Sequence, residues 1–126
     1  PFRLASQIAH RMAQGDGGNI INVSSSGGAM PLPGVVPYGC SKAALNAMSL
    51  SLAHEYAPKV RVNTLSAGPF LTDIAKAWTP EMRETNPSPR GRPGDPPDIV
   101  SSALFLASRA SVNVTGAMVR CDGGIW

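Results

Sequence analysis

The sequence predicts an α/β fold, the C-terminal half of a doubly wound parallel sheet. Segments with helical periodicity alternate with short apolar runs, in the order helix, strand, helix, strand, helix, strand. This alternation is typical of parallel strands joined by crossover helices. Right-handed crossovers that advance in one direction place their helices on one face. We therefore expect the other face, and the sheet edge at residues 19–24, to be uncovered.

Three main helices are marked by apolar spacing and by the residues at their ends. They are predicted over residues 2–12, about 37–57 and about 95–108. Proline suits the first turn of the second helix, and Pro58 ends it. Asp95 offers a capping carboxylate to the third. A short helix is expected near residues 80–85, within an irregular segment at 69–94.

Three strands are predicted, over residues 19–24, 60–66 and 117–121. A glycine-containing turn follows each of them. The whole chain, residues 1–126, then forms a single partial domain. Helical spacing already begins at Phe2, with no capping side chain before it, so we expect the N-terminal half of the domain to precede Pro1.

The composition excludes several classes of protein. The 126 residues are 43% hydrophobic and 15% charged, which excludes a disordered chain. The net charge is +3 and the basic residues are scattered, which gives no support to nucleic-acid binding. No apolar run approaches the roughly 18 residues of a membrane span. Cys40 and Cys121 are too few for a disulfide framework or a metal site, so we expect a reduced, cytoplasmic location.

Three groups of residues fall near the predicted carboxyl edge of the sheet, where α/β proteins bind ligands. Tyr38 and Lys42 are four apart on a helix, and an ammonium group beside a phenol favours proton exchange with a substrate oxygen. Serines and glycines at residues 24–28 follow the first strand, and residues 63–72 leave the second. Taken singly, the Tyr38 and Lys42 pair is also typical of a solvated helix face. The serines and glycines at residues 24–28 are likewise typical of a turn of small residues.

Four short motifs follow one another along nearly the whole chain. They are Asn22-Val23-Ser24-Ser25-Ser26-Gly27-Gly28, Tyr38-Gly39-Cys40-Ser41-Lys42-Ala43-Ala44-Leu45, Arg61-Val62-Asn63-Thr64-Leu65-Ser66-Ala67-Gly68 with Thr72, and Thr115-Gly116 with Asp122-Gly123-Gly124. Together they resemble the short-chain dehydrogenase/reductase family. The resemblance implies a Rossmann-like domain and the interconversion of a small-molecule alcohol and ketone with NAD or NADP, the choice between them staying open.

The resemblance also implies a role for each matching residue. Ser25 would bond the substrate oxygen, and Tyr38 would be the general acid/base. Lys42 would promote the ionised form of Tyr38 and hold the nicotinamide ribose. The loop after the second strand would carry the nicotinamide carboxamide. The implied catalytic residues are thus Ser25, Tyr38 and Lys42, and the implied cofactor-binding residues are Tyr38, Lys42, Gly68, Phe70 and Thr72.

The chain also departs from the family pattern. It lacks the glycine-rich phosphate loop and the residue that separates NAD from NADP, and Ala67 replaces a usual proline. The alternative is therefore a catalytically inactive fragment that acts only as an association half-domain. The family also pairs subunits through helices equivalent to the first two here, so the resemblance implies a homo-oligomer.

Other residues carry weaker expectations. Trp78 and Met82 suggest an apolar wall beside the substrate. Arg90 and Arg92 could contact an anionic substrate, but solvated loop charges are the favoured interpretation. His10 and His54 have no ligand partners nearby in sequence, and no metal site is expected.

Overall fold

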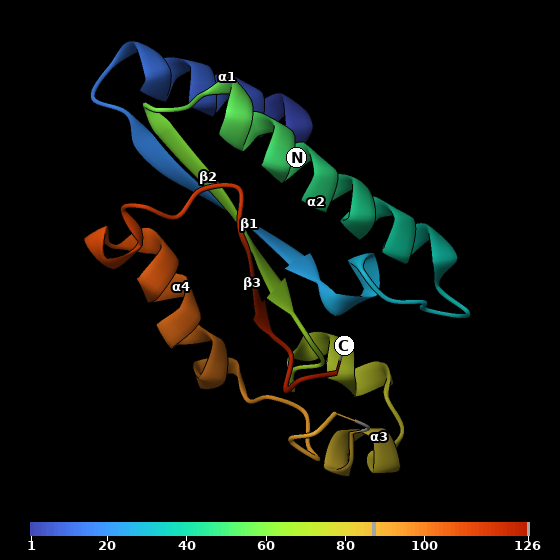
Figure 1. Ribbon diagram of the computed structural model, residues 1–126. Helices are drawn as coiled ribbons and strands as arrows, with labels where there is room; N and C mark the ends of the chain where they lie inside the picture. The colour runs from blue at the N-terminus through green and yellow to red at the C-terminus, as the bar shows by residue number, and fades with distance from the viewer. Residues whose placement is uncertain (87, 126) are drawn as a thin grey trace.

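A three-stranded parallel sheet runs through the middle of the molecule (Figure 1), which is described by a computed structural model over residues 1–86 and 88–125. The strands are β1 (Gly18–Ser25), β2 (Val60–Ala67) and β3 (Met118–Cys121), in the order β1-β2-β3. All three predicted strands are confirmed. Among the described residues β1 pairs only with β2, so its outer edge is open, as predicted.

The helices agree with the sequence in number and differ at their ends. They are α1 (Phe2–Gln14), α2 (Val36–Glu55), α3 (Pro80–Glu84) and α4 (Val100–Ala107), with 3-10 turns η1 (Ser26–Gly28), η2 (Asp73–Ala77), η3 (Pro96–Ile99) and η4 (Arg109–Ser111). α2 stops before Ala57 because the residue preceding a proline is disfavoured in helical geometry. The third predicted helix begins as a 3-10 turn, in which the Asp98 N–H donates to the Asp95 carbonyl.

Helices cover both faces of the sheet, so the prediction of one bare face is wrong. In Figure 1, α1 and α2 lie together on one side and α4 on the other. Val60 and Val62 of β2 pack against α1 and α2. Arg61, which lies between them and points to the opposite face, donates to the carbonyl of Leu106 in α4 at 3.4 Å. Asn19 of β1 donates to the same carbonyl at 2.8 Å.

The two crossovers therefore have opposite hands. Both advance in one direction across the sheet, yet α2 and α4 lie on different faces. The preference for right-handed crossovers holds for a strand that feeds directly into a helix. Here residues 68–95 separate β2 from η3, so the chain changes faces before α4 begins. As a result β2 is buried along most of its length.

An apolar cluster on one face and a buried leucine on the other hold these layers together. One joins α1, α2 and β2 through Ala5, Leu52, Ala53, Val60 and Val62. On the other face Leu106 is fully buried. In the described part of the chain, none of the helices has both the length and the apolar character that a bilayer crossing requires.

We expect Leu106→Ala to lower the free energy of unfolding by about 3 kcal/mol, because it empties a buried site that the sheet cannot fill. Leu104→Ala is the matched control on the same helix. Leu104 is 62% exposed, so its truncation is expected to change stability by less than about 0.5 kcal/mol. Urea unfolding measures both. Equal effects would show that α4 does not pack on this face.

Candidate active site

The carboxyl ends of β1 and β2 bring the predicted groups to one edge of the sheet. Ser25 ends β1 and is in register with Ala67, which ends β2. The serine run and the Gly68 loop therefore leave neighbouring strands at the same rim. α2 begins at Val36, so Tyr38 and Lys42 fall in its first two turns, next to that rim.

Ser25 and Tyr38 converge on Gly27. A Cβ placed on Gly27 would lie 3.6 Å from Ser25 Oγ and 3.6 Å from Tyr38 Cε1. The Gly27 N–H donates to Ser25 Oγ at 3.2 Å. This bond occupies a lone pair of the oxygen and leaves the hydroxyl proton to donate elsewhere. The two side chains thus flank the same small residue.

Lys42 lies beside the Tyr38 ring. Its Nζ is 5.7 Å from the ring centroid and donates to the Val23 carbonyl at 3.2 Å. The backbone of β1 therefore fixes the ammonium group near the phenol. Tyr38 is 41% exposed, so the residue is open to solvent. Residue type alone gave no sign of the Val23 contact, because the acceptor is a backbone carbonyl.

The other two serines of the run, Ser24 and Ser26, are buried, so they are not open to a substrate. Ser24 is 3% exposed and donates to the Lys42 carbonyl at 3.3 Å. Ser26 is also buried. Ser25 is the half-buried member of the three. The structure therefore brings Ser25, Tyr38 and Lys42 together.

The loop after β2 starts with a close backbone approach. A Cβ on Gly68 would lie 2.6 Å from Asp122 Cα, so only glycine fits there. Further along, Phe70 forms an isolated bridge with Gly94, and the Thr72 N–H donates to the Phe70 carbonyl at 2.8 Å. Among the described residues, no hydrogen bond joins this loop to Tyr38 or Lys42.

These residues fit the nicotinamide end of a dinucleotide in their donor chemistry. Tyr38 offers a hydroxyl and Lys42 an ammonium group at the sheet edge, and Thr72 offers an exposed hydroxyl in the neighbouring loop. Ribose hydroxyls and a carboxamide accept hydrogen bonds from such groups. The fit concerns that end of the cofactor alone, because the chain carries no phosphate-binding glycine motif.

An open groove of ≈ 510 Å³ lies between residues 29–33 and the start of α2. Its lining is mostly apolar and includes Met30, Leu32 and Val36. It also reaches Gly27, the residue on which Ser25 and Tyr38 converge. Trp78 and Met82, expected to form an apolar wall, are not among its lining residues.

Arg90 and Arg92 are partly solvated, with side chains 46% and 45% exposed, and both also pair with an acid of the same chain. Arg90 lies 3.3 Å and Arg92 lies 3.6 Å from the carboxylate of Asp98. The signal that could have revealed these pairs is the run of two arginines followed closely by two aspartates.

His10 lies on α1, away from the candidate site. His10 forms a 3.0 Å hydrogen bond with Gln14 on the exposed side of α1. In the residues that the structure describes, no group of three or more His, Cys, Asp or Glu side chains could hold a metal ion.

The fold and the site together define a class, a doubly wound α/β domain whose polar residues gather at the carboxyl ends of parallel strands. The family described as Enoyl-(Acyl carrier protein) reductase matches residues 1–126. This chain belongs to the short-chain dehydrogenase/reductase family.

Individual relatives agree with this assignment. The 3-oxoacyl-[acyl-carrier-protein] reductase FabG of Vibrio cholerae is 37% identical over 128 residues, covering 99% of this chain and 52% of that protein. The 2,5-dichloro-2,5-cyclohexadiene-1,4-diol dehydrogenase LinX of Sphingobium indicum is 41% identical over 110 residues, covering 85% of this chain and 44% of that protein. The chain thus spans about half the length of the curated relatives it matches.

Solved structures give the same result. A gluconate 5-dehydrogenase from Burkholderia cenocepacia, in complex with NADP and tartrate, is 29% identical with a TM-score of 0.89, over 98% of this chain and 51% of that one. A 7α-hydroxysteroid dehydrogenase complexed with NADH and 7-oxo glycochenodeoxycholic acid is 33% identical with a TM-score of 0.87. The match covers 98% of this chain and 50% of that one. These relatives are oxidoreductases. The structure of the first holds NADP and that of the second holds NADH.

Proposed function

We propose that this chain forms the proton-transfer half of an NAD(P)-dependent oxidoreductase that interconverts an alcohol and a ketone. The observation that carries the proposal is the approach of Ser25, Tyr38 and Lys42 at one edge of the sheet. The relatives named as dehydrogenases and reductases support it. Both dinucleotides remain compatible with it, since structures of relatives hold NADP or NADH.

Each of the three side chains has a distinct task. The Tyr38 hydroxyl donates a proton to the substrate oxygen during reduction, and the Tyr38 phenolate accepts the proton of the alcohol during oxidation. The Ser25 hydroxyl donates a hydrogen bond to the same oxygen. The Lys42 ammonium group places a positive charge beside the Tyr38 ring, where the Val23 carbonyl holds it. The dinucleotide, when bound, supplies or accepts the hydride.

The cofactor contacts are proposed on the same edge. Tyr38 and Lys42 face the nicotinamide ribose, and the loop from Gly68 through Phe70 to Thr72 faces the carboxamide. The substrate is a small molecule with an apolar part, because the groove beside Gly27 is lined mostly by apolar residues. We also propose a cytoplasmic location, where the free thiols of Cys40 and Cys121 stay reduced.

The test is NAD(P)H oxidation with a panel of apolar ketones, using the protein expressed from its complete gene. Ser25→Ala is expected to lower kcat by about 10²-fold, because one donor to the reacting oxygen is lost. Ser51→Ala is the matched control, since Ser51 is exposed on α2 and its hydroxyl donates to the Ala47 carbonyl of its own helix. Equal turnover of Ser25→Ala and the wild type would contradict the proposed site.

The alternative is a catalytically inactive half-domain that associates with a second chain. It is favoured by large apolar side chains exposed on α1 and α2, among them Leu4 (69%), Ile8 (37%) and Leu50 (49%). The same surface is our proposed homo-oligomer interface in an active protein. Titration with NAD(P)H separates the two functions. Micromolar binding contradicts the alternative, and millimolar or absent binding supports it.

A further inference from the structure

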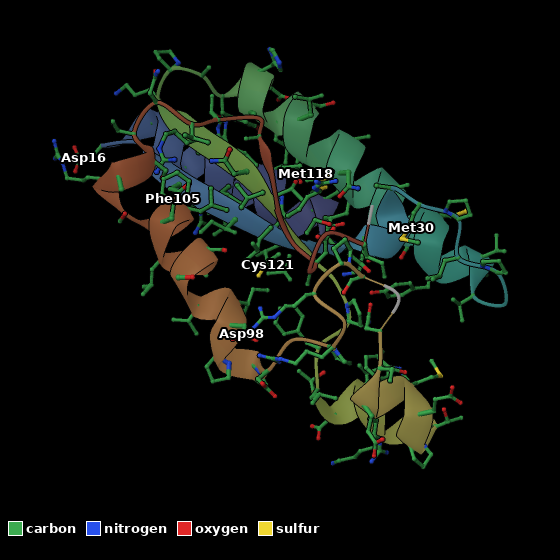
Figure 2. All side chains as sticks on the ribbon, turned by 60° about the horizontal axis from the view of Figure 1, so that its bottom comes forward. Asp16, Met30, Asp98, Phe105, Met118 and Cys121 are labelled. Atoms are coloured by element: carbon green, nitrogen blue, oxygen red, sulfur yellow. The ribbon has the colours of Figure 1, made fainter. Side chains whose placement is uncertain are left out.

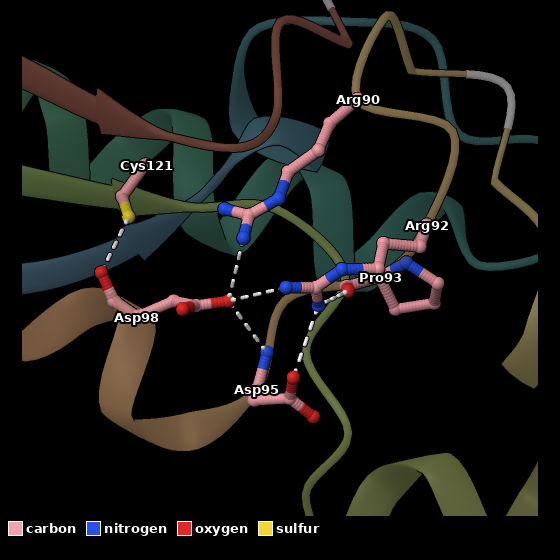
Figure 3. A network of polar contacts seen from close by, with 6 residues as sticks. All are labelled: Arg90, Arg92, Pro93, Asp95, Asp98 and Cys121. Atoms are coloured by element: carbon pink, nitrogen blue, oxygen red, sulfur yellow. Dashed lines mark hydrogen bonds and ion pairs between the residues drawn. The ribbon is translucent and has the colours of Figure 1, made fainter.

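A charged cluster holds the end of the 69–94 segment against η3, the turn that precedes α4 (Figure 3). One oxygen of Asp98, Oδ2, lies 3.3 Å from Arg90 Nη2 and 3.6 Å from Arg92 Nη2. The same oxygen accepts a hydrogen bond from the Asp95 N–H at 3.0 Å. We name these four residues, Arg90, Arg92, Asp95 and Asp98, the Asp98 clasp. The Asp98 side chain is 28% exposed, less than either arginine.

The clasp brackets Gly94 on both sides. Arg92 precedes Gly94 and Asp95 follows it, and Arg92 Nη1 also lies 3.0 Å from Asp95 Oδ2. Gly94 in turn holds the segment that begins with Pro69. Its N–H donates to the Pro69 carbonyl at 2.9 Å, and its carbonyl accepts the Leu71 N–H at 2.8 Å.

Side-chain packing reinforces this backbone bridge. A Cβ on Gly94 would lie 2.6 Å from Cε1 of Phe70, so the Phe70 ring rests directly on the glycine. Any shift of Gly94 must therefore shift Phe70. The position of residues 69–71 depends on the position of Gly94, and Gly94 is tied at both ends to Asp98.

Asp98 is itself anchored to the sheet. It lies in η3, which leads into α4, and α4 is bonded to β1 and β2 through the Leu106 carbonyl. The Asp98 carbonyl accepts a hydrogen bond from the Cys121 thiol at 3.7 Å, at the end of β3. Figure 2 shows Asp98 and Cys121 near each other at this end of the molecule. The clasp thus connects a surface loop to the rigid layers.

We propose that Asp98 is a positioning residue that fixes the Phe70–Thr72 segment through Gly94, and thereby sets the affinity for the nicotinamide cofactor. Its effect on affinity rests on the function proposed above. Its effect on the order of residues 69–71 does not. Asp98 is the acid that pairs with both arginines and accepts the Asp95 N–H, so removing its charge weakens both ion pairs at once.

The test uses Asp98→Asn in the protein expressed from its complete gene. The amide keeps the side-chain shape and an oxygen for the Asp95 N–H but removes the charge. Loss of two partly exposed ion pairs corresponds to about a tenfold effect. We expect hydrogen exchange of peptides covering residues 69–72 and 92–95 to accelerate by that factor. The KM for NAD(P)H should rise about tenfold while kcat stays within about twofold.

Two further variants separate a local charge effect from general damage. Asp98→Glu restores the carboxylate and is expected to recover most of the exchange protection and of the KM. Asp73→Asn is the matched control. Asp73 pairs with Lys76 at 2.7 Å in the same loop, but it is almost fully exposed and does not reach Gly94. It should change neither measurement.

Unchanged exchange at residues 69–72 in Asp98→Asn would overturn the clasp. Faster exchange with an unchanged KM, or a loss of kcat alone, would overturn its role in cofactor affinity. A wild-type protein that neither binds nor oxidises NAD(P)H would refute the proposed function and with it the affinity claim. Hydrogen exchange would still decide whether Asp98 positions the loop.

Discussion

Tyr38→Phe is expected to lower kcat/KM for NAD(P)H-dependent ketone reduction by about 10³-fold, within the range attributed to general acid–base catalysis. The change removes one oxygen and leaves the ring in place beside Lys42. Tyr38 is 41% exposed, and its hydroxyl forms no hydrogen bond within the described part of the chain. Its removal therefore withdraws the proposed proton donor without disturbing the fold.

Two measurements make this result specific. Thermal unfolding of Tyr38→Phe should match that of the wild type, which separates lost chemistry from lost structure. Tyr56→Phe is the matched control, because the Tyr56 hydroxyl donates to the Ser6 carbonyl at 3.5 Å, between α1 and the end of α2. It should retain turnover. If Tyr38→Phe keeps more than about a tenth of wild-type kcat/KM, another group must transfer the proton.

Gly28→Ala is expected to destabilise the protein by about 3 kcal/mol, at the upper end of typical overpacking costs. A Cβ at this position would lie 2.7 Å from the Lys42 carbonyl carbon and 2.9 Å from the Ala43 nitrogen. Both are backbone atoms of α2, so no side-chain rotation can relieve the clash. The start of α2 must move away from η1. Turnover should fall as well, because Tyr38 and Lys42 move with the helix.

Gly15→Ala provides the comparison. A Cβ there would meet only the carbonyl oxygens of Arg11 and Met12 at 3.9 Å, which is ordinary van der Waals contact. We expect its stability to stay within about 0.5 kcal/mol of the wild type and its activity to be unchanged. Urea unfolding and turnover assays measure both variants. Equal stability of the two would mean that Gly28 tolerates a side chain and that α2 does not press on η1.

The local elements were predictable because their signals lie in neighbouring residues. Apolar spacing marked α1 and α2, and glycine-bounded apolar runs marked β1, β2 and β3. The gathering of Ser25, Tyr38 and Lys42 was also predictable. The carboxyl ends of parallel strands meet at one edge, and a helix that starts there carries its first residues to the same place.

The wrong expectation of a bare sheet face came from contacts between elements that are distant in sequence. The face on which α4 lies depends on the path of residues 68–95, and no local pattern encodes that path. The pairing of Arg90 and Arg92 with Asp98 was not predicted, because Asp98 belongs to the next element.

The sequence by itself determined the order and type of the elements, the family and the edge at which the candidate site lies. Side-chain periodicity, turn residues and motif spacing are properties of short segments, and these segments hold most of that information. Only the tertiary structure decided that α4 covers the second face, that the Val23 carbonyl fixes Lys42, and that Asp98 ties Gly94 to the sheet. Each depends on backbone groups or charges brought together by packing, which residue identity alone does not specify.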